Sequence, residues 1–269
     1  TQASLGLNSL ICFSSKSIFL FADKPKILML VEGAKMEIKL MEHLLSVYGI
    51  SQSHQIVSYN TSIYDLYAHM FVDTDPDDVD LLQLLKERET DPAKKKLFDD
   101  RYSDILLVFD LDPQDSRFSV EKITQMVSYF IESSDMGKLY LNYPMVEAFY
   151  HMSSIPDPAY FSYVASLEEL QAHKYKERVV AESRNHRFSK FAVDRNECNT
   201  VIEQNIEKTW WILNHAGRGK TEQLLPEAAD VLSAQMRELA SVHCVFVLCT
   251  CVFYIPDYNP RLLHNGSSL

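Results

Sequence analysis

Short runs rich in apolar residues recur along the first half of the chain. Each run gives way to a glycine, a proline or a group of polar residues. Runs of this length, bounded in this way, are typical of strands buried in a sheet. The predicted strands are residues 26–31, 54–60, 105–109 and 138–144.

Apolar positions with helical spacing lie between these runs. They predict a helix that ends near Gly49 and a second helix over residues 118–132. Residues 61–101 are polar and charged, and we interpret them as a helical insertion between two strands. A further helix is predicted after Pro144. The alternation predicts an α/β domain over residues 1–155, with a mainly parallel sheet flanked by helices.

The pattern changes after about residue 155. Residues 156–269 are predicted to form a mostly helical C-terminal region, with helices over 166–191, 197–214 and 224–249. The most apolar run, residues 244–255, is interpreted as a buried strand or helix, because it is too short to cross a bilayer.

Composition narrows the class of protein. The chain has 269 residues and a formal net charge of −11, which argues against nonspecific coating of nucleic acid but leaves room for a local basic groove. The five cysteines form no Cys-x-x-Cys pair, and we interpret them as reduced thiols rather than zinc ligands. Apolar residues 9–21 lack the basic start of a signal peptide. We therefore expect a cytoplasmic protein that does not bind membranes.

Carboxylates follow two of the predicted strands. Glu32 comes after residues 26–31, and Asp110 and Asp112 come after 105–109. Ligands bind at the carboxyl ends of parallel strands, so these acids are expected to meet there. The Asp-x-Asp pair stands at a strand end, and alternation along the strand also sends both aspartates to one side. Carboxylate oxygens suit Mg²⁺, and such a cluster favours a bound cation because the acids repel one another.

The Asp-x-Asp pair also resembles the opening of haloacid-dehalogenase-type phosphatases, in which the first aspartate attacks phosphorus. Pro113 and Gln114 stand where that family has glycine and threonine. The alternative of turn or helix-capping acids applies to Asp110, and that of ordinary helix acids applies to Glu37 and Glu147.

Three segments together resemble the Toprim domain of topoisomerases, primases and OLD-type nucleases, and more narrowly the RloB-like proteins of bacterial defence islands. They are VEGAKME at 31–37, VFDLD at 108–112 and NYPMVEAF at 142–149. Met36 stands where the family has threonine, and Tyr143 separates Asn142 from Pro144. The resemblance covers about residues 24–155. It implies a Toprim-like sheet and a set of metal ligands: Glu32, Glu37, Asp110, Asp112 and Glu147.

The resemblance implies a Mg²⁺-dependent (or Mn²⁺-dependent) nuclease that cleaves RNA, with tRNA as one candidate, or DNA. Glu32, Asp110 and Asp112 would be the catalytic residues, with Lys35 contacting a phosphate. The enzyme would act in antiviral defence under the control of a partner, for which an ATPase is a candidate. A homo-oligomer is a further candidate for the state of the protein. The alternatives are a metal-binding assembly module that does not cleave and the phosphatase described above.

A basic stretch in the C-terminal region predicts a surface for nucleic acid. Aromatic residues alternate with its charges, as nucleic-acid-binding surfaces require. The alternative is a solvated helix face paired with neighbouring acids. The predicted binding residues are Lys174, Lys176, Arg178, Arg184, Arg187 and Lys190.

Overall fold

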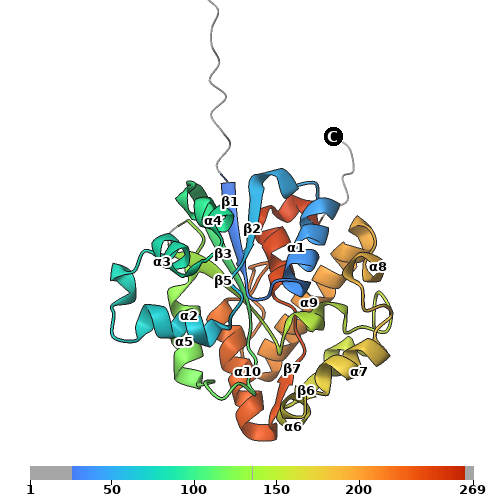
Figure 1. Ribbon diagram of the computed structural model, residues 1–269. Helices are drawn as coiled ribbons and strands as arrows, with labels where there is room; N and C mark the ends of the chain where they lie inside the picture. The colour runs from blue at the N-terminus through green and yellow to red at the C-terminus, as the bar shows by residue number, and fades with distance from the viewer. Residues whose placement is uncertain (1–25, 135, 264–269) are drawn as a thin grey trace, which may run out of the picture.

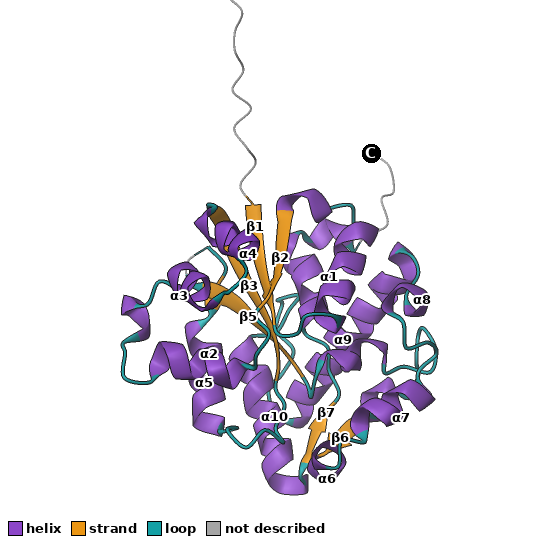
Figure 2. Ribbon diagram, viewed as in Figure 1, coloured by secondary structure: helices purple, strands orange, loops and turns teal. Residues whose placement is uncertain are grey.

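The computed structural model describes residues 26–134 and 136–263. A five-stranded sheet with the order β2-β1-β3-β5-β4 runs through the middle, and Figure 2 shows helices on both sides of it. The parallel strands are β1 (Lys26–Val31), β2 (His54–Ser58), β3 (Tyr102–Asp110) and β5 (Gly137–Asn142), while β4 (Ile131–Glu132) is an antiparallel edge strand. This confirms the predicted α/β class with a mainly parallel sheet.

The central strands are apolar because both of their faces are covered. Residues 28–31 of β1 and 106–109 of β3 are buried, as expected for parallel strands that lie between two layers of helices. The α-helices of the first half are α1 (Met36–Val47), α2 (Ile63–Phe71), α3 (Leu81–Arg88), α4 (Pro92–Lys95) and α5 (Val120–Tyr129). Figure 1 shows α1 on one side of the strands and α2 with α5 on the other.

The insertion at residues 61–101 is helical, as predicted. It contains α2, α3 and α4, together with 3₁₀ turns at Pro76–Asp78 and Lys96–Asp99. Asp80 caps α3, because its Oδ1 accepts a hydrogen bond from the Gln83 N–H at 3.0 Å. The helix predicted after Pro144 is only a 3₁₀ helix, Val146–Tyr150. Further 3₁₀ turns are Ser51–Ser53, Tyr160–Ser162, Cys251–Phe253 and Pro260–Leu262.

The C-terminal region is mostly helical, with two corrections. The α-helices are α6 (Leu167–Gln171), α7 (Tyr175–Glu182), α8 (Phe188–Phe191), α9 (Arg195–His215), α10 (Ala228–Val242) and α11 (Tyr254–Tyr258). The helix predicted over 166–191 is therefore three shorter helices. The helix predicted over 224–249 ends at Val242, because His243 adopts the left-handed conformation with φ 57°. The chain then forms β7 (Cys244–Phe246), which pairs antiparallel with β6 (Val164–Ser166).

Residues of the C-terminal region join the core of the first half. The Thr250 hydroxyl donates to the Leu141 carbonyl at 2.8 Å, and the Tyr143 N–H donates to the Leu248 carbonyl at 2.8 Å. One continuous cluster of buried apolar side chains includes residues from both regions. The domain border near residue 155 stays a prediction.

A fully buried lysine holds part of this region together. Lys208, in α9, donates from Nζ to the carbonyls of Tyr160 at 2.8 Å and Tyr163 at 2.9 Å. Its ammonium group also lies 4.3 Å from the centre of the Tyr160 ring. Burial lowers the pKa of Lys208 well below its usual value. The lysine thus supplies hydrogen bonds to the 3₁₀ turn Tyr160–Ser162 and to Tyr163 directly after it, which pack against α9.

No helix in the described part of the chain combines the length and apolar character that a bilayer crossing requires. The predictions for residues 9–21 and Cys12 lie outside the described residues. The other four cysteines, Cys198, Cys244, Cys249 and Cys251, are free.

Candidate metal centre

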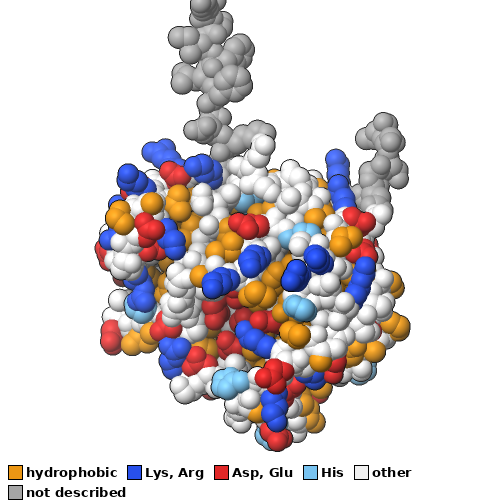
Figure 3. Space-filling model, turned by 45° about the vertical axis from the view of Figure 1, so that its right-hand side comes forward, with side chains coloured by type: hydrophobic (Ala, Val, Ile, Leu, Met, Phe, Trp, Pro, Cys, Tyr) orange, Lys and Arg blue, Asp and Glu red, His pale blue; other side chains and the backbone are white. Residues whose placement is uncertain are grey.

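Four of the five predicted metal ligands line one pocket of about 310 Å³. They are Glu32, Glu37, Asp110 and Asp112. Figure 3 shows acidic side chains gathered on the face that carries α1, α7 and α8, with Lys and Arg side chains around them. The pocket lies where β1 and β3 end, so the predicted meeting of acids at the carboxyl ends of parallel strands is confirmed.

Backbone pairing brings Glu32 and Asp110 together. The Glu32 N–H donates to the Val108 carbonyl at 3.0 Å, which extends the β1–β3 pairing beyond β1. The Asp110 N–H donates to Glu32 Oε2 at 2.9 Å. On the other side of β3, Asn142 stands in register with Asp110, and its Nδ2 donates to Asp110 Oδ1 at 3.2 Å. The ends of three neighbouring strands therefore fix the position of Asp110.

Asp112 reaches the pocket by a turn rather than by strand alternation. β3 ends at Asp110, and Asp112 has a φ of 41°, in the left-handed region. Its N–H donates to the Pro144 carbonyl at 3.1 Å, and its Oδ1 accepts from Gln114 Nε2 at 2.9 Å. The Tyr64 hydroxyl donates to the Leu111 carbonyl within the same turn. Strand alternation therefore does not place Asp112, and that prediction is wrong, although both aspartates line the pocket.

Gly33 leaves room for the Glu37 carboxylate. A Cβ atom at Gly33 would lie 2.5 Å from Glu37 Oε2, which is closer than real Cβ atoms approach an oxygen. Glu37 lies in the first turn of α1 and is buried. The Glu-Gly pair after β1 therefore allows α1 to start close beside the strand end, with its first acid turned towards the pocket.

Glu147 is the predicted ligand that does not line the pocket, but it forms an ion pair with Lys176 of α7, which does. Lys176 Nζ lies 2.9 Å from Glu147 Oε1, and Lys176 lines the pocket. Glu147 is 3% exposed, and its Oε2 has no hydrogen-bond partner. Burial alone would lower the pKa of Lys176, because it disfavours the charged form. The nearby Glu147, Asp110 and Asp112 carboxylates have the larger combined effect and raise this pKa. A cation from the C-terminal region thus already partly balances the acids.

The carboxylates of the pocket hold their protons more tightly than ordinary acids. Burial raises the pKa of Glu32 to about 8, helped by the charges of Asp112 and Glu37 and opposed by the Asp110 N–H. Burial, followed by the charge of Glu32, raises the pKa of Asp110 well above its usual value. Burial also raises the pKa of Glu37 and Asp112. Groups shifted in this way favour a cation near them.

The carboxylates of the pocket are of the chemical type that binds a divalent ion, but their present arrangement does not enclose one. Among residues 26–134 and 136–263, no three acid, thiol or imidazole side chains are set closely enough to hold a metal ion. The pocket nevertheless offers the oxygen ligands that Mg²⁺ and Mn²⁺ take, and the unpartnered Glu147 Oε2 would gain from a cation. Side-chain rotation of the acids would be needed to close a coordination shell.

No family model, curated protein or solved structure matches this chain. The Toprim resemblance therefore stays a prediction, and the site is argued from its geometry.

The remaining predicted site residues are Lys35, which was expected to contact a phosphate, and the basic stretch of the C-terminal region. Lys35 is exposed and does not line the pocket, so its contact with a phosphate stays a prediction. Arg178 is paired with Glu169 at 2.6 Å, and Arg184 with Glu197 at 2.7 Å. The aromatic residues of the basic stretch, Tyr175, Phe188 and Phe191, are buried. They belong to the core and cannot stack on bases.

Lys174, Arg187 and Lys190 are exposed, and their binding of nucleic acid stays a prediction. Asn142, Gln114 and His173 also belong to the site, although none of them was predicted to be a site residue. Asn142 ends a strand inside one of the three segments that resemble the Toprim domain, and this was the signal that could have found it. Gln114 follows the Asp-x-Asp pair after Pro113, and His173 begins the basic stretch.

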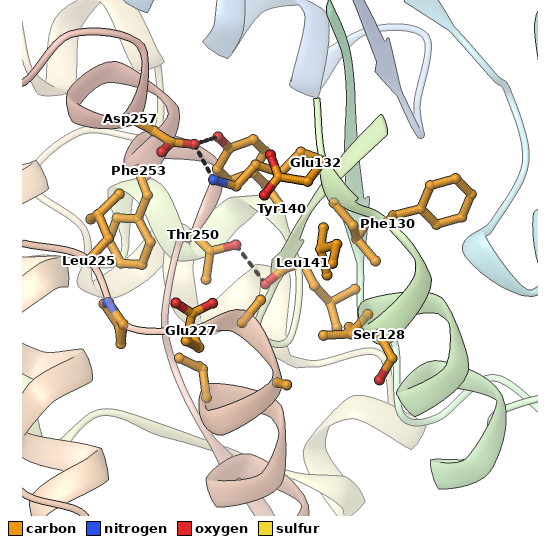
Figure 4. A pocket seen from close by; sticks show the side chains of 18 of the residues that line it. Ser128, Phe130, Glu132, Tyr140, Leu141, Leu225, Glu227, Thr250, Phe253 and Asp257 are labelled. Atoms are coloured by element: carbon orange, nitrogen blue, oxygen red, sulfur yellow. Dashed lines mark hydrogen bonds and ion pairs between the residues drawn. The ribbon is translucent and has the colours of Figure 1, made fainter. Parts of the chain in front are cut away.

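A larger pocket of about 430 Å³ lies at the outer edge of the sheet, between β5 and α10 (Figure 4). Its walls are mainly apolar, and Asp257 accepts hydrogen bonds there from Lys138 and Tyr140. It contains none of the predicted site residues. Choosing a candidate site by pocket volume alone would therefore have selected this pocket and not the one that contains the acids.

The raised pKa of Glu32 predicts a pH-dependent stability. Between about pH 5 and 8 the folded protein keeps a proton on Glu32 that the unfolded chain releases, so stability falls as pH rises through this window. We expect the metal-free protein to lose at least about 1.4 kcal/mol, the equivalent of one pKa unit. Urea unfolding in EDTA at pH 5 to 9 measures the loss. Glu32→Gln should flatten the curve, and an equally steep curve in this variant would contradict the assignment.

Lys176 is expected to compete with a metal ion for the acids. Lys176→Met keeps the length of the side chain and removes its charge, so Mn²⁺ should bind about threefold or more tightly. Calorimetric titration with Mn²⁺ measures the change. Lys174→Met is the matched control, because Lys174 is exposed and does not line the pocket. Unchanged or weaker binding in Lys176→Met would contradict the prediction.

Proposed function

We propose that this protein is a Mg²⁺-dependent (or Mn²⁺-dependent) nuclease that hydrolyses phosphodiester bonds. The observation that carries the proposal is the meeting of Glu32, Glu37, Asp110 and Asp112 in one pocket at the ends of β1 and β3. Buried acids that repel one another lower the stability of a fold unless a cation joins them. Such a cluster is therefore better explained by a function than by packing.

The residues support distinct roles in this chemistry. Asp110, Asp112, Glu37 and Glu147 would hold the ion, which when bound polarises a phosphoryl oxygen and activates water. Glu32 would act as general base or as a further ligand, because burial raises its pKa to about 8 in the metal-free protein and a bound cation would lower that pKa towards neutral pH. Lys176 Nζ would face the phosphate from the opposite region of the chain. Its charge would offset part of the negative charge that the acids and the phosphate share.

The biological setting is proposed from the sequence resemblance. It supports RNA, including tRNA, or DNA as the substrate and a role as an effector in antiviral defence. A partner that controls the nuclease is part of this proposal, with an ATPase as the candidate. The chain has a net charge of −11, so contact with a nucleic acid would depend on local basic groups such as Lys174, Arg187 and Lys190.

The alternative is a metal-binding module that does not cleave. A module of this kind would bind the ion to fix the arrangement of α1 and α7 and would leave nucleic acid intact. Metal binding alone therefore does not separate the two proposals.

The test combines metal binding with three substrates. The full chain is titrated with Mg²⁺ and Mn²⁺ by calorimetry, then incubated with plasmid DNA, total tRNA and p-nitrophenyl phosphate, with EDTA as control. Cleavage of a nucleic acid that requires the metal supports the nuclease. Turnover of the phosphomonoester alone would favour the phosphatase. Metal binding without turnover, also in the presence of a candidate ATPase, would favour the assembly module.

A further inference from the structure

A wall from the C-terminal region stands beside the acids. From the C-terminal region, the pocket is lined by Leu170 at the end of α6, by His173, and by Tyr175 and Lys176 at the start of α7. The turn between α6 and α7 thus narrows the approach to the ends of β1 and β3. In Figure 1, α6 and α7 lie beyond the lower ends of these strands.

The wall is firmly attached. Leu170 and Tyr175 are buried, and the Tyr175 hydroxyl lies 3.2 Å from His151 Nδ1. Arg178 Nη2 donates to the Val164 carbonyl at 2.7 Å, and Arg178 Nε donates to Glu169 Oε1 at 2.6 Å. Opening the wall would break these contacts and expose apolar surface. The narrow approach is therefore a fixed property of the site.

Two of the acids are buried behind this wall, and two are half-buried. Asp110 is 6% exposed and Glu37 is 8% exposed, while Glu32 and Asp112 remain partly accessible from the pocket of about 310 Å³. A phosphate of a double helix lies on the outer surface of a stiff cylinder, so it reaches a recessed acid only if the neighbouring backbone of both strands can approach as well. An unpaired strand is flexible, so it can bend locally and bring a single phosphate into the recess. The recess behind the wall therefore selects for a flexible substrate.

We infer that the site accepts the phosphodiester of an unpaired strand and excludes that of a continuous double helix. The inference rests on the proposed function and adds the class of substrate. It applies to RNA and DNA alike, because the barrier is the width of the approach and involves no contact with a 2′-hydroxyl.

His173 is the residue that tests the barrier. It is exposed, lines the pocket and has a φ of 57°. His173→Gly shortens the wall without backbone strain, because glycine adopts this conformation freely. His243→Gly is the matched control, since His243 has the same φ of 57° and does not line the pocket.

The experiment compares a fluorescent single strand, its duplex, and a duplex with an internal unpaired loop, each as RNA and as DNA. Cleavage is measured with Mn²⁺, and binding is measured by anisotropy in Asp110→Asn. We expect the single strand and the loop to be cleaved at least about tenfold faster than the duplex, a difference of 1.4 kcal/mol. His173→Gly should reduce that ratio at least about threefold, and His243→Gly should leave it unchanged.

Each other outcome is decisive. A duplex that is cleaved as fast as the single strand overturns the inference and leaves the proposed nuclease standing. An unchanged ratio in His173→Gly overturns the role of the wall. If no substrate is cleaved, the anisotropy ratio decides: tighter binding of the unpaired strands supports the inference, and equal binding overturns it. Metal binding without cleavage then counts against the nuclease alone.

Discussion

Asp110→Asn is expected to reduce metal-dependent cleavage at least about a thousandfold, a loss on the order of 4 kcal/mol of transition-state stabilisation. The same change should stabilise the metal-free protein, most strongly at alkaline pH, because it removes an acid whose ionisation is opposed by burial and by the charge of Glu32. Asparagine keeps the shape of the side chain and the oxygen that accepts from Asn142. Opposite signs for activity and stability would identify a functional site.

Asp104→Asn is the matched control for this experiment. Asp104 lies on the same strand, β3, and its Oδ1 accepts from the Ser133 hydroxyl at 2.7 Å, away from the pocket. Cleavage and metal binding should both be retained. Cleavage is followed on the substrates named above, and stability by urea unfolding in EDTA. Metal-dependent cleavage that survives Asp110→Asn would remove Asp110 from the site.

Lys208→Ala is expected to destabilise the protein by about 3 kcal/mol. It removes one of the two hydrogen bonds that each of the Tyr160 and Tyr163 carbonyls accepts and opens a cavity inside the core. Lys208→Met fills most of the space but supplies no donor, so it should cost less, about 1–2 kcal/mol. Urea unfolding at neutral pH measures both. Lys190→Ala, at an exposed position, should change stability by less than about 0.5 kcal/mol.

Equal losses in Lys208→Ala and Lys208→Met would assign the effect to hydrogen bonding alone. A stability in Lys208→Ala like that of Lys190→Ala would contradict the role of the lysine. The site acids should keep their affinity for Mn²⁺ in a folded Lys208→Met protein, since Lys208 does not line the pocket.

The central strands and the acids at their ends could be predicted from the sequence, because both depend on local pattern. An apolar run such as residues 26–31 has few alternatives to a buried strand, and parallel strands place Glu32 and Asp110 at the same edge. The turn at Asp112 was not predictable, because its left-handed φ is held by Pro144 from another segment.

Lys176 was predicted to bind nucleic acid, but its ion pair with Glu147 could not be predicted, because it depends on a distant segment. Lys176 reaches the acids only because α7 packs beside Glu147. In the sequence, Lys176 looks like Arg178 two positions later, which pairs with Glu169 instead. Helical spacing also explains the alternating aromatics of the basic stretch, since one face of a short helix must enter the core while the other remains charged.

The place of Asn142 between two regions has a practical consequence. Its Nδ2 donates to Asp110, while its Oδ1 accepts from the Cys251 N–H at 3.2 Å. A fragment cut after residue 155 would leave that oxygen without its donor and would strip Leu248 from Tyr143. The carboxyl ends of the strands would then lose an outer support that arrives about a hundred residues later in the chain. Removing the helical half would therefore dismantle the acidic pocket as well as shorten the protein.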